Sequence, residues 1–232
     1  MKKIGFIGTG IMGASMAGHL IDAGYTVSVY NRTKSKADGL VKKGARWCNT
    51  PGECAAGQDV IITIVGYPKD VEEVYLGADG IVAKAPKGAY IIDMTTSSPV
   101  LAEKIAGEAA KKGLHAVDAP VTGGDTGARN ATLTILVGGE KEAFDALQPI
   151  FKAMGKTIVY MTFRAAGDVR FPMYAGIGSM LLFRIVFAYI FGTIMGIGVF
   201  GTWMAMFLDW FVRDLLFIFR YLSGKWMKYK SI

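Results

Sequence analysis

Three glycines near the start of the sequence have the spacing best suited to chemistry. Gly8, Gly10 and Gly13 follow the apolar run 4–7, and apolar residues then recur at helical spacing until Gly24. In a strand–turn–helix, such glycines permit a tight turn, close approach of a pyrophosphate and close packing of helix on strand. The helix N-terminus adds free N–H groups and partial positive charge. The spacing therefore predicts a dinucleotide-binding turn.

The residues after the second expected strand, 27–30, bear on the choice of dinucleotide. A site specific for NAD usually carries an acidic residue here to bind the ribose 2′-hydroxyl. This sequence has Asn31, Arg32 and Thr33 instead. A guanidinium suits a 2′-phosphate, and the amide and hydroxyl could donate beside it. We therefore predict NADP as the cofactor, with NAD as the alternative; Arg32 as a mere solvated surface charge is the other interpretation.

Short apolar runs alternate with helical patterns over the first 160 residues. Strands are expected at 4–7, 27–30, 45–47, 59–65, 90–94, 115–119, 133–137 and 157–160, and helices at 34–43, 70–75, 100–112 and 140–154. Thr50, Pro51 and Glu53 form the pattern of a capping box. This alternation predicts an α/β fold, a Rossmann-like doubly wound and mostly parallel sheet. The loops singled out for chemistry would then share the carboxyl edge of one sheet.

Charge and cysteine content narrow the function classes. Of the net charge of +7, five charges belong to residues 161–232, which carry eight Lys or Arg and three Asp. The front part is therefore nearly balanced, which argues against nucleic acid as a partner. The only cysteines, Cys48 and Cys54, have no metal-ligand or disulfide-framework spacing and fit a reducing compartment. Met1-Lys2-Lys3 leads directly into the first strand, so no signal peptide is expected.

Several ordered motifs together resemble the β-hydroxyacid dehydrogenase family, which includes 3-hydroxyisobutyrate dehydrogenase and 2-hydroxy-3-oxopropionate (tartronate semialdehyde) reductase. The matching segments are IGFIGTGIMGASMAGHL, VYNRT, VGYPKDVEEVY, DMTTSSP and DAPVTGG, within residues 1–160. The resemblance implies an NADP-dependent oxidoreductase that moves a hydride between the nicotinamide and a small 3-hydroxy acid or semialdehyde.

The resemblance also implies roles for particular residues. The pyrophosphate would lie on Gly8, Gly10, Ile11, Met12 and Gly13, and the adenosine ribose on Asn31, Arg32 and Thr33. Val65, Gly66 and Pro68 would line the path to the nicotinamide, which Thr95 or Thr96 would contact; the loop 95–98 also suits a helix N-cap. Thr122, Gly123 and Gly124 would hold the substrate carboxylate, although an ordinary turn is the alternative there.

The resemblance ends near Tyr160, where the family continues into a helix with the pattern G-x-G-x-x-x-K-x-x-x-N. The lysine of that helix is the family's general acid and base. No segment after residue 160 has this pattern, since Lys225, Lys228 and Lys230 all lie in a terminal cluster. We therefore assign no catalytic residue and expect a truncated dehydrogenase that is inactive by itself. The alternatives are a membrane-tethered dinucleotide-binding module and a transporter-fragment fusion, both without catalysis.

The remaining residues, 162–232, are predicted to form a second domain, a transmembrane hairpin of two helices. The apolar stretches 171–195 and 199–222 are each long enough to cross a bilayer, and basic residues flank their outer ends. The positive-inside rule then puts both ends, and the Rossmann domain of residues 1–161, on the cytoplasmic side of a membrane. Residues 163–227 resemble the last two helices of multidrug and toxic compound extrusion transporters, so the chain looks like a fusion near Met161. Buried soluble helices are the alternative.

Overall fold

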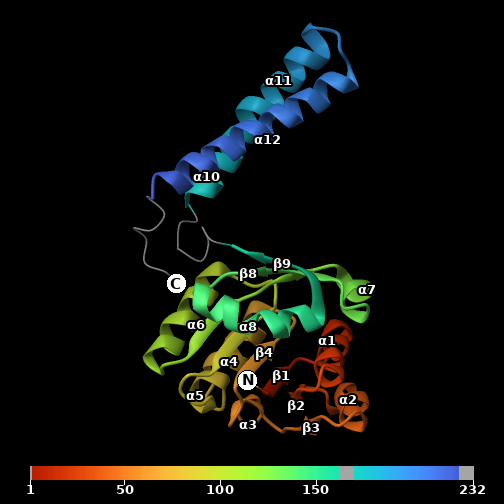
Figure 1. Cartoon of the computed structure of the whole chain (residues 1–232), viewed down its shortest axis with the longest axis vertical. Coiled ribbons are helices and arrows are strands. Elements are labelled where there is room, and N and C mark those ends of the chain that lie inside the picture. Colours follow the sequence, from red (N-terminus) through yellow and green to blue (C-terminus); the bar gives the residue numbers. More distant parts are fainter. Residues whose placement is uncertain (1, 162–169, 225–232) are drawn as a thin grey trace. The chain divides into compact units, whose positions relative to one another are not determined.

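The structure is a computed structural model that describes residues 2–161 and 170–224. The chain divides into two compact units, residues 1–161 and 162–231. Figure 1 labels the helices and strands of both units. The flanking basic residues Arg164, Lys225, Lys228 and Lys230 lie outside the described residues.

A six-stranded parallel sheet forms the centre of the first unit. Its strands lie in the order β3-β2-β1-β4-β5-β6, and every neighbouring pair is parallel. The bounds are β1 Lys3–Ile7, β2 Thr26–Tyr30, β3 Arg46–Trp47, β4 Val60–Thr63, β5 Tyr90–Asp93 and β6 His115–Asp118. This order, which reverses direction beside β1, confirms the Rossmann-like fold.

The last three strands form a separate sheet, so the expectation of one sheet for all strands was wrong. β7 (Val121–Thr122) pairs antiparallel with β8 (Leu133–Val137), which pairs parallel with β9 (Gly155–Tyr160). Only Ala119 and Pro120 connect β6 to β7. A parallel neighbour needs a crossover of a dozen or more residues, so β7 cannot join the large sheet as a further parallel strand. One bridge, Asp118 to Gly138, links the two sheets.

Helices cover both faces of the large sheet. Their bounds are α1 Ile11–Asp22, the 3₁₀ turn η1 Lys34–Ala37, α2 Asp38–Lys42, α3 Pro51–Ala55, α4 Pro68–Leu76, α5 Ile81–Lys84, α6 Pro99–Lys111, α7 Gly124–Arg129 and α8 Lys141–Met154. The expected capping box at α3 is half formed. Thr50 Oγ1 accepts the Glu53 N–H at 3.0 Å, but the Glu53 carboxylate accepts the N–H of Asn49 rather than that of Thr50.

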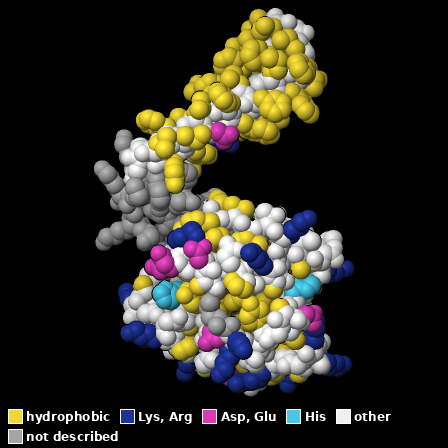
Figure 2. Space-filling view, viewed as in Figure 1, with side chains coloured by type: hydrophobic (Ala, Val, Ile, Leu, Met, Phe, Trp, Pro, Cys, Tyr) yellow, Lys and Arg dark blue, Asp and Glu magenta, His cyan; other side chains and the backbone are white. Residues whose placement is uncertain are grey.

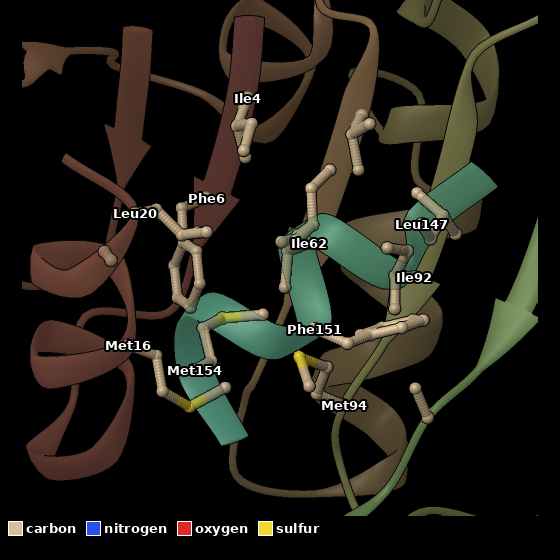
Figure 3. Close-up of a cluster of buried hydrophobic side chains, with 14 of the residues drawn as sticks. Ile4, Phe6, Met16, Leu20, Ile62, Ile92, Met94, Leu147, Phe151 and Met154 are labelled. Atoms are coloured by element: carbon tan, nitrogen blue, oxygen red, sulfur yellow. The ribbon is translucent and has the colours of Figure 1, made fainter. Parts of the chain in front are cut away.

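The two faces bury two apolar clusters because neighbouring residues of a strand point to opposite sides. Ile62 and Ile92 pack with α1 and α8. Phe151 of α8 belongs to the same cluster (Figure 3). Ile61 and Ile91, one residue earlier, pack with α4 and α6 on the other face. Burial on both faces explains why the strands are nearly continuous apolar runs, and it fixes the edge at which their carboxyl ends meet.

The second unit is a helical hairpin. Its first arm runs through α10 (Arg170–Ser179), the π-helical segment η2 (Met180–Ile185), α11 (Val186–Tyr189) and the π-helical segment η3 (Ile190–Ile194), and its second arm is α12 (Val199–Leu222). Gly196 and Gly198 have positive φ and make the turn between them. A Cβ on Gly201 would lie 2.7 Å from the Phe191 carbonyl carbon, so glycine is needed where the arms meet.

Large apolar side chains cover the outside of the hairpin (Figure 2). Among the described residues, one helical segment, Phe171–Ile194, is long and apolar enough to cross a membrane, with a mean hydropathy of 1.9. The expectation of two such helices is not met by α12, which carries Asp209, Arg213, Asp214 and Arg220. A membrane-spanning hairpin therefore stays a prediction.

Candidate functional site

The glycine turn joins β1 to α1 with no room for larger residues at two positions. Gly8 has a φ of +98°, and a Cβ there would lie 2.1 Å from the Ile64 carbonyl oxygen. A Cβ on Gly13 would lie 1.9 Å from the carbonyl oxygen of Gly8. These close approaches hold the first turn of α1 directly against the end of β1.

Gly10 differs from these two glycines because the space beside it is open. Nothing lies within 4 Å of a Cβ built on Gly10, which is the N-cap of α1 and makes no side-chain cap. Next to it, the hydroxyl of Thr9 is buried with no hydrogen-bond partner. Ile11 is exposed and Met12 is half-buried. Uncapped N–H groups, partial positive charge and an unpaired hydroxyl suit the oxygens of a pyrophosphate.

Asn31 ties the end of β2 to the glycine turn. Its Oδ1 accepts the Thr9 N–H at 3.0 Å, and its Nδ2 donates to the Thr33 carbonyl at 2.9 Å. The amide thus shapes the turn, a function that the sequence pattern alone did not indicate. Thr33 is exposed.

Arg32 is an exposed member of the predicted ribose residues. Its side chain is 85% exposed, and its Nη1 lies 3.3 Å from Oδ1 of Asp70 in the first turn of α4. The sequence analysis did not identify Asp70. A usable signal was present, because Pro68 marks the start of a helix and Asp70 lies in its first turn. Nearby, Gly66 and Pro68 are exposed and Val65 is half-buried.

Thr95 is held at the ends of β4 and β5 by a buried polar network. Its Oγ1 accepts the Val65 N–H at 3.0 Å, and its own N–H donates to Asp93 Oδ1 at 3.0 Å. Thr63 Oγ1 lies 2.9 Å from the same Asp93 oxygen and 3.0 Å from the hydroxyl of Tyr75. The Thr95 hydroxyl therefore accepts from Val65 and also hydrogen-bonds the Asp93 carboxylate.

Burial changes the acidity of this network. It raises the pKa of Asp93, and hydrogen bonds from Thr95 and Thr63 oppose that rise. The pKa of Tyr75 is raised well above its usual range, chiefly by burial and then by the charge of Asp93. Next in the chain, Thr96 is exposed, while the Ser97 hydroxyl is buried without a partner.

The structure brings most of the predicted residues to one edge. The glycine turn and the loops 31–33, 65–68 and 95–97 follow β1, β2, β4 and β5, which are neighbours in one parallel sheet. Contacts from Asn31 to Thr9 and from Thr95 to Val65 join these loops.

Thr122, Gly123 and Gly124 belong instead to the three-stranded sheet and the start of α7. Thr122 pairs with Thr134, while Gly123 and Gly124 both have positive φ. His19 Nε2 lies 2.9 Å from the Ala128 carbonyl oxygen, so its role is to hold α1 against α7. No group of side chains able to hold a metal ion occurs among residues 2–161 and 170–224.

Comparison with known proteins shows where this arrangement recurs. Residues 3–162 match the family described as the NAD binding domain of 6-phosphogluconate dehydrogenase. The uncharacterized oxidoreductase YkwC of Bacillus subtilis is 59% identical over 159 residues, which are 68% of this chain and 55% of YkwC. The 3-hydroxyisobutyrate dehydrogenase of Pseudomonas aeruginosa is 39% identical over 169 residues, which are 73% of this chain and 57% of that enzyme.

Solved structures agree. The 3-hydroxyisobutyrate dehydrogenase of Mycobacterium tuberculosis has a TM-score of 0.67 and 28% identity, over 86% of this chain and 67% of that one. The chain spans about half the length of the curated relatives that it matches. By its glycine turn, its strand order and these matches, the chain belongs to the family of the NAD-binding domain of 6-phosphogluconate dehydrogenase, among the β-hydroxyacid dehydrogenases that resemble 3-hydroxyisobutyrate dehydrogenase.

Proposed function

We propose that the first unit binds NADP at the carboxyl edge of its six-stranded sheet. The observation that carries this is the open position at Gly10, between an uncapped helix N-terminus and the unpaired Thr9 hydroxyl. The pyrophosphate would lie on residues Gly8–Gly13. Arg32 would face the 2′-phosphate, because no acidic residue follows β2. NAD is the alternative cofactor.

The reaction that we propose is the one implied by the family, oxidation or reduction of a small 3-hydroxy acid or semialdehyde. The bound nicotinamide would accept or supply the hydride. Thr95, which Val65 and Asp93 hold in place, would contact the nicotinamide half, and Thr122, Gly123 and Gly124 would hold the substrate carboxylate. We assign no residue to the proton transfer, because the lysine pattern of the family does not occur after residue 160.

Binding is tested by titrating NADPH into the full chain in detergent and following nicotinamide fluorescence. Gly10→Val should abolish binding at a cost of about 1 kcal/mol in stability, because its side chain occupies the open space where the phosphates would lie and is a poorer N-cap than glycine. Gly107→Val is the matched control, since Gly107 in α6 is also open but far from the turn in sequence. Equal binding by wild type and Gly10→Val would contradict the proposed site.

Turnover is a separate question from binding. NADPH oxidation by the full chain with tartronate semialdehyde would support the dehydrogenase function. Binding without turnover of this or of 3-hydroxyisobutyrate would favour the alternative, a dinucleotide-binding module without catalysis.

We also propose that the hairpin attaches the chain to a membrane, with the first unit on the cytoplasmic side. The apolar segment Phe171–Ile194 and the exposed apolar residues of α12 support this. The test is whether the chain stays in the membrane fraction after an alkaline carbonate wash. Release by the wash would contradict membrane insertion and favour a surface or soluble hairpin. The origin of the hairpin as transporter helices joined near Met161 stays a prediction.

A further inference from the structure

Arg32 and Asp70 form an ion pair between two loops that are far apart in sequence. Arg32 follows β2, Asp70 lies in the first turn of α4 after β4, and β1 lies between these two strands in the sheet. The Nη1 of Arg32 is 3.3 Å from Oδ1 of Asp70. The pair therefore connects the loops on either side of the glycine turn, where the adenosine half of a dinucleotide enters.

Asp70 is the fixed member of this pair. Its other oxygen, Oδ2, accepts the N–H of Tyr67 at 3.2 Å, and its side chain is only 25% exposed. The N-terminus of α4 adds favourable partial positive charge to the carboxylate. Arg32, by contrast, is 85% exposed on a long side chain. The Asp70 carboxylate thus determines the position of the Arg32 guanidinium.

From this geometry we infer that Asp70 is a specificity-determining residue that weakens binding of NADP relative to NAD. A 2′-phosphate that bound Arg32 would come close to the Asp70 carboxylate and would compete with it for the same guanidinium. Both effects oppose the charged phosphate, and neither acts on the neutral 2′-hydroxyl of NAD. The inference rests on the proposed dinucleotide site, and it concerns only the ratio of the two affinities.

The test compares NADPH and NADH titrations of the full chain in detergent. Asp70→Asn removes the charge but keeps an oxygen that can accept the Tyr67 N–H. It should tighten NADPH binding by about threefold to tenfold and leave NADH binding within about twofold. The expected gain corresponds to the interaction energy of exposed charges several ångströms apart. The gain should shrink as salt rises from 50 to 500 mM, as screening requires. Glu73→Gln, which removes an exposed charge from the same helix, is the matched control and should change neither affinity.

Three results would overturn the inference. Weaker NADPH binding by Asp70→Asn would mean that Asp70 serves to position Arg32 for the phosphate. Equal gains for NADPH and NADH would mean a general charge effect without selectivity. A wild-type chain that binds neither dinucleotide would refute the proposed function itself and this inference with it, and that outcome is recognised before any variant is compared.

Discussion

The hydroxyl of Thr95 accepts the N–H of Val65 at 3.0 Å, and this bond joins the carboxyl ends of β4 and β5. It links two loops that would both line the cofactor path, and it orients the Thr95 proton away from Val65. In the proposed site, the contact would therefore connect the stability of the sheet edge to the binding of the nicotinamide half.

The first prediction removes that contact. Thr95→Val would leave the Val65 N–H without its acceptor, at a cost of about 1–3 kcal/mol in the free energy of unfolding. It should also weaken NADPH binding, because the loop 95–98 that would contact the nicotinamide half loses its side-chain bond to Val65. Urea unfolding and NADPH titration measure the two effects. Thr157→Val, at an exposed position of β9, is the control; equal losses in both variants would contradict a special role for Thr95.

The second prediction concerns pH and Asp93, whose pKa is raised by burial. The folded state binds a proton more tightly than the unfolded state, so the unfolding free energy should fall as pH rises from about 3.9 through the raised pKa. Asp93→Asn keeps the oxygen that accepts from Thr95 and Thr63 but cannot ionise. It should therefore gain stability relative to wild type as pH rises, by about 1.4 kcal/mol for each unit of the shift.

Urea unfolding of wild type and Asp93→Asn at several pH values between 3.5 and 7 measures this difference. Asp38→Asn, at an exposed position in α2, is the control. A difference between wild type and Asp93→Asn that does not change with pH would contradict the role given to burial.

The third prediction separates two glycines of one turn. Gly13→Ala places a methyl group 1.9 Å from the Gly8 carbonyl oxygen, so the first turn of α1 must move. We expect a loss of about 2 kcal/mol or more in the unfolding free energy, as is usual when backbone must shift. Gly10→Ala, where the space is open, should cost less than about 0.5 kcal/mol. Similar stabilities of the two variants by urea unfolding would show that the turn is looser than its geometry indicates.

This turn also shows how much the sequence could predict. Local signals sufficed for it: glycine spacing between an apolar run and a helical pattern indicated the turn, and uninterrupted apolar runs indicated strands covered on both faces. The separate three-stranded sheet was missed because β7 has two residues and α7 six, too few for a periodic pattern. The Asp70 contact with Arg32 was missed because it joins residues 38 positions apart, which no local pattern records.

The fourth prediction reverses the charge at the predicted 2′-phosphate position. Arg32→Asp should shift the preference of the chain from NADPH towards NADH, because a carboxylate there repels the phosphate and can accept a hydrogen bond from the ribose 2′-hydroxyl. The loss of NADPH affinity should be about tenfold or more, the range of a lost charge-assisted bond. Lys36→Asp, with the same change of charge at an exposed residue of η1, is the control. Unchanged NADPH affinity in Arg32→Asp would leave Arg32 as a surface charge.

The last prediction concerns the charged centre of the hairpin. Asp209 is 0% exposed, and its carboxylate lies 3.2 Å from Arg184 on η2 and 2.9 Å from Arg213 on its own helix. The Nε of Arg213 also donates to Ser179 Oγ at 3.2 Å, which joins both arms. The Asp209 carboxylate thus pairs with two arginines where the helices meet.

Asp209→Asn would leave these arginines without their anion, and because both arginines are partly exposed we expect a cost of about 1–3 kcal/mol. We therefore expect the hairpin of this variant to lose its helical circular dichroism at lower urea concentration in detergent micelles. Asp214→Asn, at an exposed position of the same helix, should behave as wild type. Only the Asp209 variant removes a contact between the two arms. If both variants unfold at the same urea concentration as wild type, apolar packing and not the ion pair holds the arms together.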